Sequence, residues 1–159
     1  MFQAVSIAVI IVLTVIDRLT KQLIVTSVKV NGPFELIPGF IRFRYVENTG
    51  AAFSSFSNNT QLLTVVTVAV ILVCFAVIML RKIKPVFAEI CLVLIVAGGI
   101  GNVIDRIAFG FVVDFIEPLF VDFAVFNFAD ICITVGAFML IGYEIYDLVR
   151  SRKSKEKQK

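Results

Sequence analysis

The segment from residue 98 to residue 130 carries a group of polar side chains at the ends of two apolar stretches. The group consists of Asn102, Asp105, Arg106, Asp114, Asn127 and Asp130. An ionised side chain next to hydrocarbon costs several kcal/mol unless it is paired or hydrated. Polar residues retained at such positions indicate a functional site.

Asp114 and Asp130 are the two members of this group that suggest a reaction. Two carboxylates in a partly dehydrated site cannot both ionise easily, so they share a proton. One can then activate a water molecule while the other protonates or polarises an amide. The two residues are therefore candidates for amide hydrolysis by a pair of aspartates.

Simpler structural roles for the same residues remain open at this point. Asn127 and Asp130 are three residues apart, as in a capping arrangement at the start of a helix. Asp114 can be a solvated acid in a loop, and Asp105 can form a structural ion pair with Arg106.

The composition limits the chemistry that the chain can perform. Of 159 residues, 59% are hydrophobic and 17% are charged, and the mean hydropathy is +0.97, which is typical of a membrane protein. The absence of histidine excludes Ser-His-Asp and Cys-His sites and the HExxH zinc motif. Cys74, Cys91 and Cys132 are isolated in apolar segments, so we expect no metal site, disulfide framework or cofactor.

Four apolar segments are long enough to cross a hydrocarbon core of about 30 Å. The expected transmembrane helices cover about residues 2–28, 60–80, 86–107 and 128–149. The first lacks the basic start and the small-residue cleavage site of a cleaved signal peptide, so we interpret it as a retained helix. Within it, Asp17 and Lys21 are four residues apart, share a helix face and can neutralise one another.

The region between the first two helices, residues 29–58, differs in character. It contains Asn-Gly-Pro and Pro-Gly turn signals, and residues 40–46 alternate with the period of a strand. We predict a small β element there and a loop over residues 108–127. The expected fold class is an all-α membrane protein with four transmembrane helices and a small extracytoplasmic β element between helices 1 and 2, in one membrane-embedded domain covering 1–159.

Lysine and arginine are distributed unevenly along the chain. The turn at 81–84 has three and the tail at 150–159 has six, against three over the much longer 29–58 region. The positive-inside rule therefore predicts that both termini and this turn are cytoplasmic. The net charge of +3 comes from the tail, which we interpret as facing anionic lipid, so no nucleic-acid partner is expected.

Five short segments together resemble the signature segments of a known family. They are residues 17–21 (DRLTK), 48–53 (NTGAAF), 101–106 (GNVIDR), 112–115 (VVDF) and 126–130 (FNFAD). In this order, and with four apolar helices, they are similar to bacterial lipoprotein signal peptidase, or signal peptidase II. Five segments in register are far more specific than any one of them.

This resemblance implies a membrane aspartic endopeptidase of the bacterial cytoplasmic membrane. It would remove signal peptides from diacylglyceryl-modified prolipoproteins, cutting on the N-terminal side of the lipidated cysteine, with Asp114 and Asp130 as the catalytic pair. The supporting polar residues would be Asp17, Lys21, Asn48, Asn102, Arg106 and Asn127. Asp105 would be structural, paired with Arg106 or another cation, and Arg18 departs from the family, where an uncharged amide is expected.

The same resemblance implies how the substrate arrives and where the site lies. The expected partners are lipid-modified prolipoproteins and membrane lipids, and the chain is expected to be a monomer. Because a diacylglyceryl cysteine is itself a membrane anchor, the scissile bond would enter sideways from the outer leaflet. Gly98, Gly99 and Gly101 leave room for a neighbouring backbone, so we expect this face, and Gly99 in particular, to contact the signal peptide near the outer membrane face.

Three other readings compete with the peptidase. A small ion or proton-coupled membrane transporter would also retain polar residues in its helices, but the chain has no internal repeat or paired broken helices. A presenilin-like protease is favoured only by Tyr146-Asp147, without the accompanying Gly-x-Gly-Asp. A purely structural subunit would leave the number of polar residues at one depth unexplained.

Overall fold

The computed structural model describes residues 2–50, 60–82 and 85–156, with side chains as far as residue 153. Residues 51–53 of the segment 48–53 (NTGAAF) and residues 83–84 of the basic turn lie outside the described residues.

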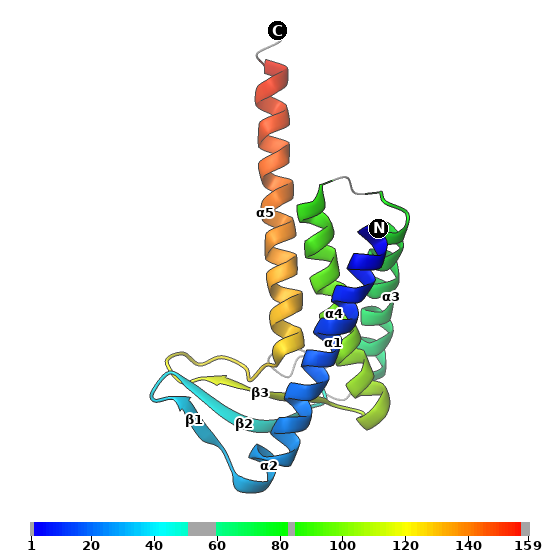
Figure 1. Cartoon of the computed structure of the whole chain (residues 1–159). Helices are drawn as coiled ribbons and strands as arrows, with labels where there is room; N and C mark the ends of the chain where they lie inside the picture. The colour runs from blue at the N-terminus through cyan, green and yellow to red at the C-terminus, as the bar shows by residue number, and fades with distance from the viewer. Residues whose placement is uncertain (1, 51–59, 83–84, 157–159) are drawn as a thin grey trace.

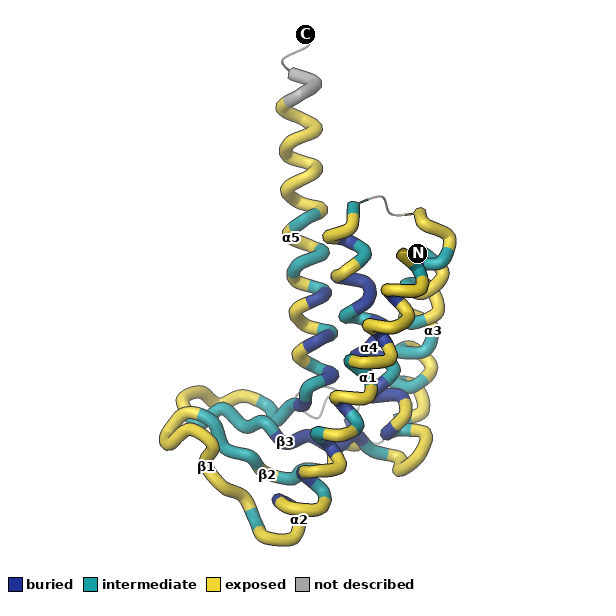
Figure 2. Tube along the Cα trace, in the orientation of Figure 1, coloured by how far each residue is buried: buried dark blue, intermediate teal, exposed yellow. Residues whose placement is uncertain are grey.

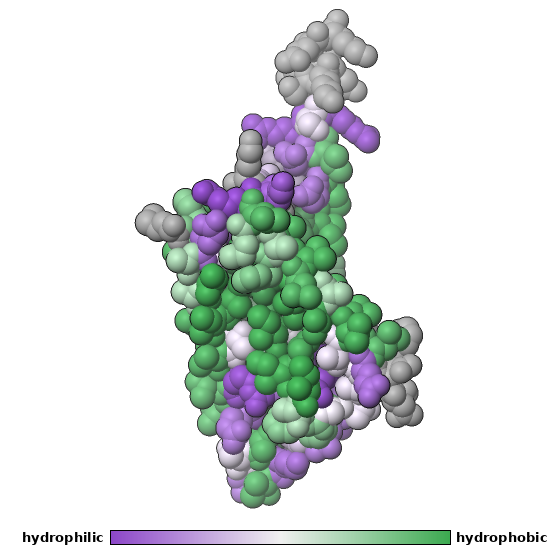
Figure 3. Space-filling view, turned by 90° about the vertical axis from the view of Figure 1, so that its right-hand side faces the viewer, coloured by the Kyte–Doolittle hydropathy of each residue, from purple (hydrophilic) through white to green (hydrophobic). Residues whose placement is uncertain are grey.

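Four long helices form a bundle (Figure 1). They are α1 (Phe2–Thr26), α3 (Thr60–Met79), α4 (Val86–Phe109) and α5 (Phe128–Glu156), and the short α2 (Val28–Asn31) follows α1. Each long helix contains a stretch that is long and apolar enough to cross a membrane. In the face seen in Figure 3, an apolar band lies between hydrophilic ends, as expected for a membrane-spanning bundle. The four predicted transmembrane helices are confirmed.

The helix ends follow from local sequence. α4 starts directly after Pro85 and ends before Gly110, which adopts a left-handed conformation (φ 80°) and donates its N–H to the carbonyl of Arg106 at 3.1 Å. α5 continues beyond the expected end near residue 149, because its charged C-terminal part contains neither Gly nor Pro to stop it. Figure 1 shows this end of α5 projecting past the other helices.

A three-stranded antiparallel sheet lies at the end of the bundle opposite the two chain termini (Figure 1). We call this end the sheet side. The strands are β1 (Phe34–Ile37), β2 (Ile41–Asn48) and β3 (Val112–Pro118), in the order β1-β2-β3. The register of β2 on β3 places Val46 opposite Asp114 and Asn48 opposite Val112.

The third strand corrects the predicted loop at 108–127, and the β element is therefore not confined to the region between the first two helices. Val112, Val113, Asp114 and Phe115 are all buried, so β3 lacks the alternation of polar and apolar residues that marks a half-exposed strand. A second apolar cluster, of Ile24, Val28, Val113 and Phe115, packs the sheet against α1 and α2.

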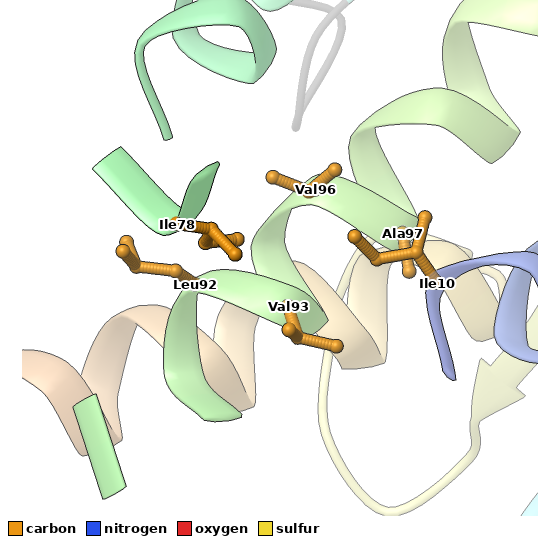
Figure 4. Packing of buried hydrophobic residues seen from close by; sticks show 6 residues of the cluster. All are labelled: Ile10, Ile78, Leu92, Val93, Val96 and Ala97. Atoms are coloured by element: carbon orange, nitrogen blue, oxygen red, sulfur yellow. The ribbon is translucent and has the colours of Figure 1, made fainter. Parts of the chain in front are cut away.

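α4 is the central helix and contacts α1, α3 and α5. Most of the dark buried positions in Figure 2 lie along it and along the neighbouring start of α5. Figure 4 shows the main apolar cluster, in which side chains from α1, α3 and α4 meet. The cluster consists of Ile10, Ile78, Leu92, Val93, Val96 and Ala97.

Close contact between α4 and its neighbours depends on glycine, as is common where lipid supplies no hydrophobic drive for helix association. A Cβ added at Gly98 would clash with the carbonyl oxygen of Ala129 in α5. A Cβ at Gly136 in α5 would lie 2.7 Å from the carbonyl oxygen of Cys91 in α4. Both clashes involve backbone atoms, so the α4–α5 distance requires glycine on each helix.

We therefore expect Gly136→Ala to lower the midpoint of thermal unfolding of the purified protein in detergent, by the equivalent of about 1–3 kcal/mol. Gly142→Ala on the same helix is the matched control, because nothing lies within 4 Å of a Cβ added there. It should leave the midpoint unchanged or raise it, since alanine favours helix by about 1 kcal/mol over glycine. Equal effects of the two substitutions would contradict this account of the α4–α5 contact.

Candidate active site

A buried lysine lies at the centre of the polar residues on the sheet side. The side chain of Lys21 is only 2% exposed, and its Nζ lies 2.9 Å from Asp17 Oδ2, 3.0 Å from Asp105 Oδ2 and 3.0 Å from Asn102 Oδ1. Two carboxylates and one amide oxygen thus surround the ammonium group. The predicted pairing of Asp17 with Lys21 within α1 is confirmed. The contacts of Lys21 with Asp105 and Asn102 join α1 to α4.

The two acids around Lys21 connect it to the rest of the site. Asp105 also pairs with Arg18 and accepts a hydrogen bond from the backbone N–H of Val113 in β3 at 3.2 Å. The expected ion pair of Asp105 with Arg106 is therefore wrong, and the alternative, a pair with another cation, is confirmed. Asp17 Oδ1 accepts from the backbone N–H of Ala129 at 3.1 Å, which holds the first turn of α5 against α1.

Asn102 connects Lys21 to Asp130, one of the candidate acids, through hydrogen bonds. Its Oδ1 accepts from Lys21 Nζ and from Asn127 Nδ2, at 3.0 and 3.2 Å. Its Nδ2 consequently points the other way and donates to Asp130 Oδ1 at 2.8 Å. The buried cation thus sets the orientation of an amide that binds Asp130.

Asn127 and Asp130 form a reciprocal cap at the start of α5. The backbone N–H of Asp130 donates to Asn127 Oδ1 at 3.0 Å, and the backbone N–H of Asn127 donates to Asp130 Oδ2 at 3.1 Å. The capping arrangement predicted from the spacing is present. It does not compete with a chemical role, because Asn127 Nδ2 also donates to Asp114 Oδ1 at 2.6 Å. Asn127 therefore binds both acids, Asp114 through its side chain and Asp130 through its backbone N–H.

Asp114 is buried on β3 and is not a solvated loop acid. Its Oδ1 accepts a hydrogen bond from Asn127 Nδ2, and its Oδ2 accepts one from Asn48 Nδ2 at 2.8 Å. The residue is 2% exposed. Burial, followed by the negative charge of nearby Asp130, raises the pKa of Asp114 from 3.8 to about 7. The hydrogen bonds from the two asparagines act in the opposite direction and are outweighed.

Both acids line a cavity of about 430 Å³ between β3 and the start of α5. Asn48 and Asn102 add amide groups to its lining, and Arg106 adds a guanidinium group. The remaining walls are mainly apolar and come from β3, the segment before α5 and one face of α5: Val112, Phe123, Ala124, Val125, Phe126, Ile131, Ile133, Thr134 and Val135. An apolar pocket with a few convergent polar groups is typical of a binding site for a small or extended ligand.

The predicted site residues other than Gly99 fall into two groups in the structure. Asp114, Asp130, Asn48, Asn102 and Arg106 line the cavity. Asp17, Lys21 and Asn127 lie behind it and form the hydrogen-bonded network that positions the lining residues.

Gly99 lies apart from both groups. A Cβ added there would meet Ile71 Cγ1 of α3 at 2.8 Å, so this position serves the packing of α3 on α4 and does not line the cavity. This location of Gly99 in the structure does not support its predicted contact with a signal peptide.

The apolar wall on α5 was not predicted as part of the site. Ile131, Thr134 and Val135 have the spacing of one helix face, but α5 is apolar around most of its circumference, so the sequence does not distinguish this face from the others. Among the described residues, no three His, Cys, Asp or Glu side chains are placed to bind a metal ion.

Comparison with known proteins agrees with this arrangement. A family model described as "Signal peptidase (SPase) II" matches residues 9–146. The chain belongs to the signal peptidase II family. It is accordingly an aspartic-type peptidase with membrane-spanning helices, and the resemblance carried by the five short segments is confirmed.

Similar members of the signal peptidase II family come from streptococci. A lipoprotein signal peptidase of Streptococcus agalactiae serotype Ia is 41% identical over 133 residues, which cover 82% of this chain and 85% of the relative. One from Streptococcus thermophilus (strain CNRZ 1066) is 38% identical over 126 residues, which cover 79% of this chain and 82% of the relative.

Two solved structures have the same fold. One is a bacterial membrane enzyme determined by the in meso method at 2.3 Å resolution, with a TM-score of 0.84, 30% identity and coverage of 91% of this chain and 90% of that chain. The other, also described as a bacterial membrane enzyme, has a TM-score of 0.80, 30% identity and coverage of 91% and 94%.

Proposed function

We propose that this chain removes signal peptides from diacylglyceryl-modified prolipoproteins by cutting on the N-terminal side of the lipidated cysteine. The observation that carries the proposal is the placement of Asp114 and Asp130 in one cavity, where both accept hydrogen bonds from Asn127, Asp114 from its side-chain amide and Asp130 from its backbone N–H. Membership of the signal peptidase II family, and relatives named lipoprotein signal peptidase, support the choice of substrate.

In the proposed reaction the pair holds one proton and one water molecule. The ionised carboxylate takes a proton from the water as its oxygen bonds to the scissile carbonyl carbon, and the protonated carboxyl donates to the carbonyl oxygen. The resulting tetrahedral species then breaks its carbon–nitrogen bond as a proton passes to the departing amine. A pKa of about 7 for Asp114 suits this role, because the group can hold or release a proton near neutral pH. The two acids titrate as a coupled pair, so the shared proton belongs to the pair and not to one residue.

The apolar face of α5 is the proposed path for the lipid-bearing part of the substrate. Ile131 and Val135 are exposed and adjoin the cavity, so acyl chains lying in the bilayer can follow this face to the acids. Each buried CH₂ favours the bilayer by about 0.8 kcal/mol, which keeps the lipidated cysteine at the membrane while its peptide bond enters the site. The route on the other side of α4, at Gly98–Gly101, is filled by α3 and α5.

We further propose that the sheet side faces the outside of the bacterial cytoplasmic membrane. The two described residues of the basic turn, Arg81 and Lys82, lie at the opposite end, and Arg150, Arg152 and Lys153 follow the apolar part of α5 there. The positive-inside rule assigns this end to the cytoplasm.

The aspartate pair predicts a distinctive pattern of inactivation. Asp114→Asn and Asp130→Asn should each lower cleavage of a diacylglyceryl-modified precursor by about 10²–10⁴-fold, because each removes a proton-transfer partner. The double variant should be no worse than the single variants, since the two groups act as a unit. Purified variants at matched concentration, tested also on the unmodified precursor, provide the measurement.

Asp122→Asn is the matched control for this series, because Asp122 is exposed, lies in the same segment and does not line the cavity. It should retain wild-type activity. Substantial cleavage by Asp130→Asn would mean that Asp130 only caps α5, and equal cleavage of lipidated and unmodified precursors would refute the proposed substrate class.

The raised pKa of Asp114 predicts the direction of the pH dependence. The pair loses its remaining proton as the pH rises through about 7, so kcat/KM should fall across this range. The hydrogen bond from Asn48 favours the ionised form of Asp114 and lowers its pKa. Asn48→Ala should therefore shift the fall to higher pH, whereas Asp122→Asn should leave its midpoint unchanged. A rate that increases through pH 7 would contradict the mechanism.

The proposed orientation can be measured by cysteine labelling in a variant that lacks Cys74, Cys91 and Cys132. Phe40 is exposed in the turn between β1 and β2, so Phe40→Cys should react with a membrane-impermeant thiol reagent added to cells with an accessible outer face. Ser151→Cys, exposed at the other end, should react only after the membrane is opened. The reverse pattern would place the sheet side in the cytoplasm.

A further inference from the structure

We propose that a second cavity on the sheet side binds the phosphate of an anionic phospholipid. This cavity has a volume of about 240 Å³ and lies among the ends of α1 and α4, α2 and the strands β2 and β3. Its basic side chains are Arg18, Lys21 and Lys29. The other lining residues are Gln22, Val25, Tyr45, Phe109, Phe111 and Val113.

The second cavity is separate from the candidate active site. Val112 and Asp114 line the candidate active site, whereas Val113 lines the second cavity. Successive residues of a strand point to opposite faces, so β3 forms a partition between the two. None of the lining residues is shared.

The charges around the second cavity favour an anion. No carboxylate is among the described residues that line it. Asp17 and Asp105, which neutralise Lys21, lie behind the wall and are 1% and 0% exposed. Glu47, which pairs with Lys29, is exposed but is not among the residues that line the cavity, so the cavity wall itself presents ammonium and guanidinium groups.

Arg18 and Lys29 have donors left for such a ligand. Arg18 uses Nη1 to bind Asp105, and its Nε and Nη2 make no hydrogen bond to another described residue. Lys29 Nζ donates to Tyr45 Oη at 3.0 Å and to Glu47 Oε1 at 3.2 Å, which leaves one of its three N–H groups. A guanidinium fork matches the geometry of phosphate oxygens, and a lysine adds a point charge.

Aromatic rings hold both cations at the cavity. The guanidinium carbon of Arg18 lies 5.7 Å from the centre of the Phe109 ring, and Lys29 Nζ lies 4.4 Å from the centre of the Tyr45 ring. Cation–π contacts at these distances favour the observed positions. The side chains are therefore placed before a ligand arrives, which reduces the entropy lost on binding.

The surroundings of the cavity indicate that the phosphate belongs to a lipid. Leu19 and Leu23 on α1 and Ile107 on α4 are 58%, 65% and 73% exposed, beside the residues that line the cavity. They belong to membrane-spanning helices and can contact acyl chains while the phosphate lies at headgroup level. A zwitterionic headgroup would bring an ammonium group towards three basic residues, so an anionic phospholipid is favoured.

Native mass spectrometry of the full-length protein, released from detergent with dioleoyl phosphatidylglycerol or dioleoyl phosphatidylcholine, tests the proposal without measuring proteolysis. Wild type should bind phosphatidylglycerol more tightly. Arg18→Gln and Lys29→Gln should each weaken that binding by about fivefold, as expected for one basic residue near an anionic headgroup. Arg44→Gln is the matched control, since Arg44 is an exposed basic residue of the same sheet outside the cavity, and it should bind as wild type does.

Two features keep the result decisive. Arg18 also supports Asp105, so Arg18→Gln can disturb folding, but Lys29 is 47% exposed and its substitution leaves the buried network intact. Equal retention of the two lipids by wild type, or an equal loss in Lys29→Gln and Arg44→Gln, would overturn the proposal. Complete displacement of phosphatidylglycerol by millimolar inorganic phosphate would overturn the assignment to a lipid and leave a site for the free anion.

Discussion

Burial of the Lys21 ammonium group is the constraint on which the sheet side of this protein depends. An ionised group deep in a protein is tolerated only when its charge and its hydrogen bonds are matched, and loss of one partner of a buried pair costs about 3–5 kcal/mol. Asp17, Asp105 and Asn102 meet this requirement for Lys21. Because they come from α1 and α4, and bind backbone N–H groups of β3 and α5 in turn, one cation determines how four elements meet.

The side-chain amides of Asn102 and Asn127 connect the buried lysine to the two candidate acids. An amide side chain has a donor end and an acceptor end, so a cation at the acceptor end of Asn102 leaves its donor for Asp130. Asn127 then connects Asn102, Asp114 and the first turn of α5. The carboxylates are thus held by groups whose own orientations are fixed. Such preorganisation is what acid–base catalysis requires, because no reorganisation is then needed at the moment of reaction.

Hydropathy was sufficient to predict the four helices, because a span of apolar residues in lipid has to satisfy its own backbone hydrogen bonds and only a helix does so locally. It was insufficient for β3. The strand pairs with β2, more than sixty positions earlier in the chain, and both of its faces are covered, so no local pattern marks it. The end of α5 was also misplaced, since loss of hydrophobicity at residue 150 ends the membrane span but does not end a helix.

The sequence alone singled out Asp114 and Asp130 as candidate acids, because a carboxylate beside apolar segments stands out by residue type. It also determined the capping spacing of Asn127 with Asp130 and the helical spacing of Asp17 with Lys21, since both depend on contacts within one turn. The tertiary structure alone decided that Asp105 pairs with Arg18 and Lys21 instead of its neighbour Arg106, and that Gly99 faces α3. It also decided that β3 separates an acidic cavity from a basic one. These contacts join residues far apart in the chain, and their geometry follows from how the helices and the sheet pack together.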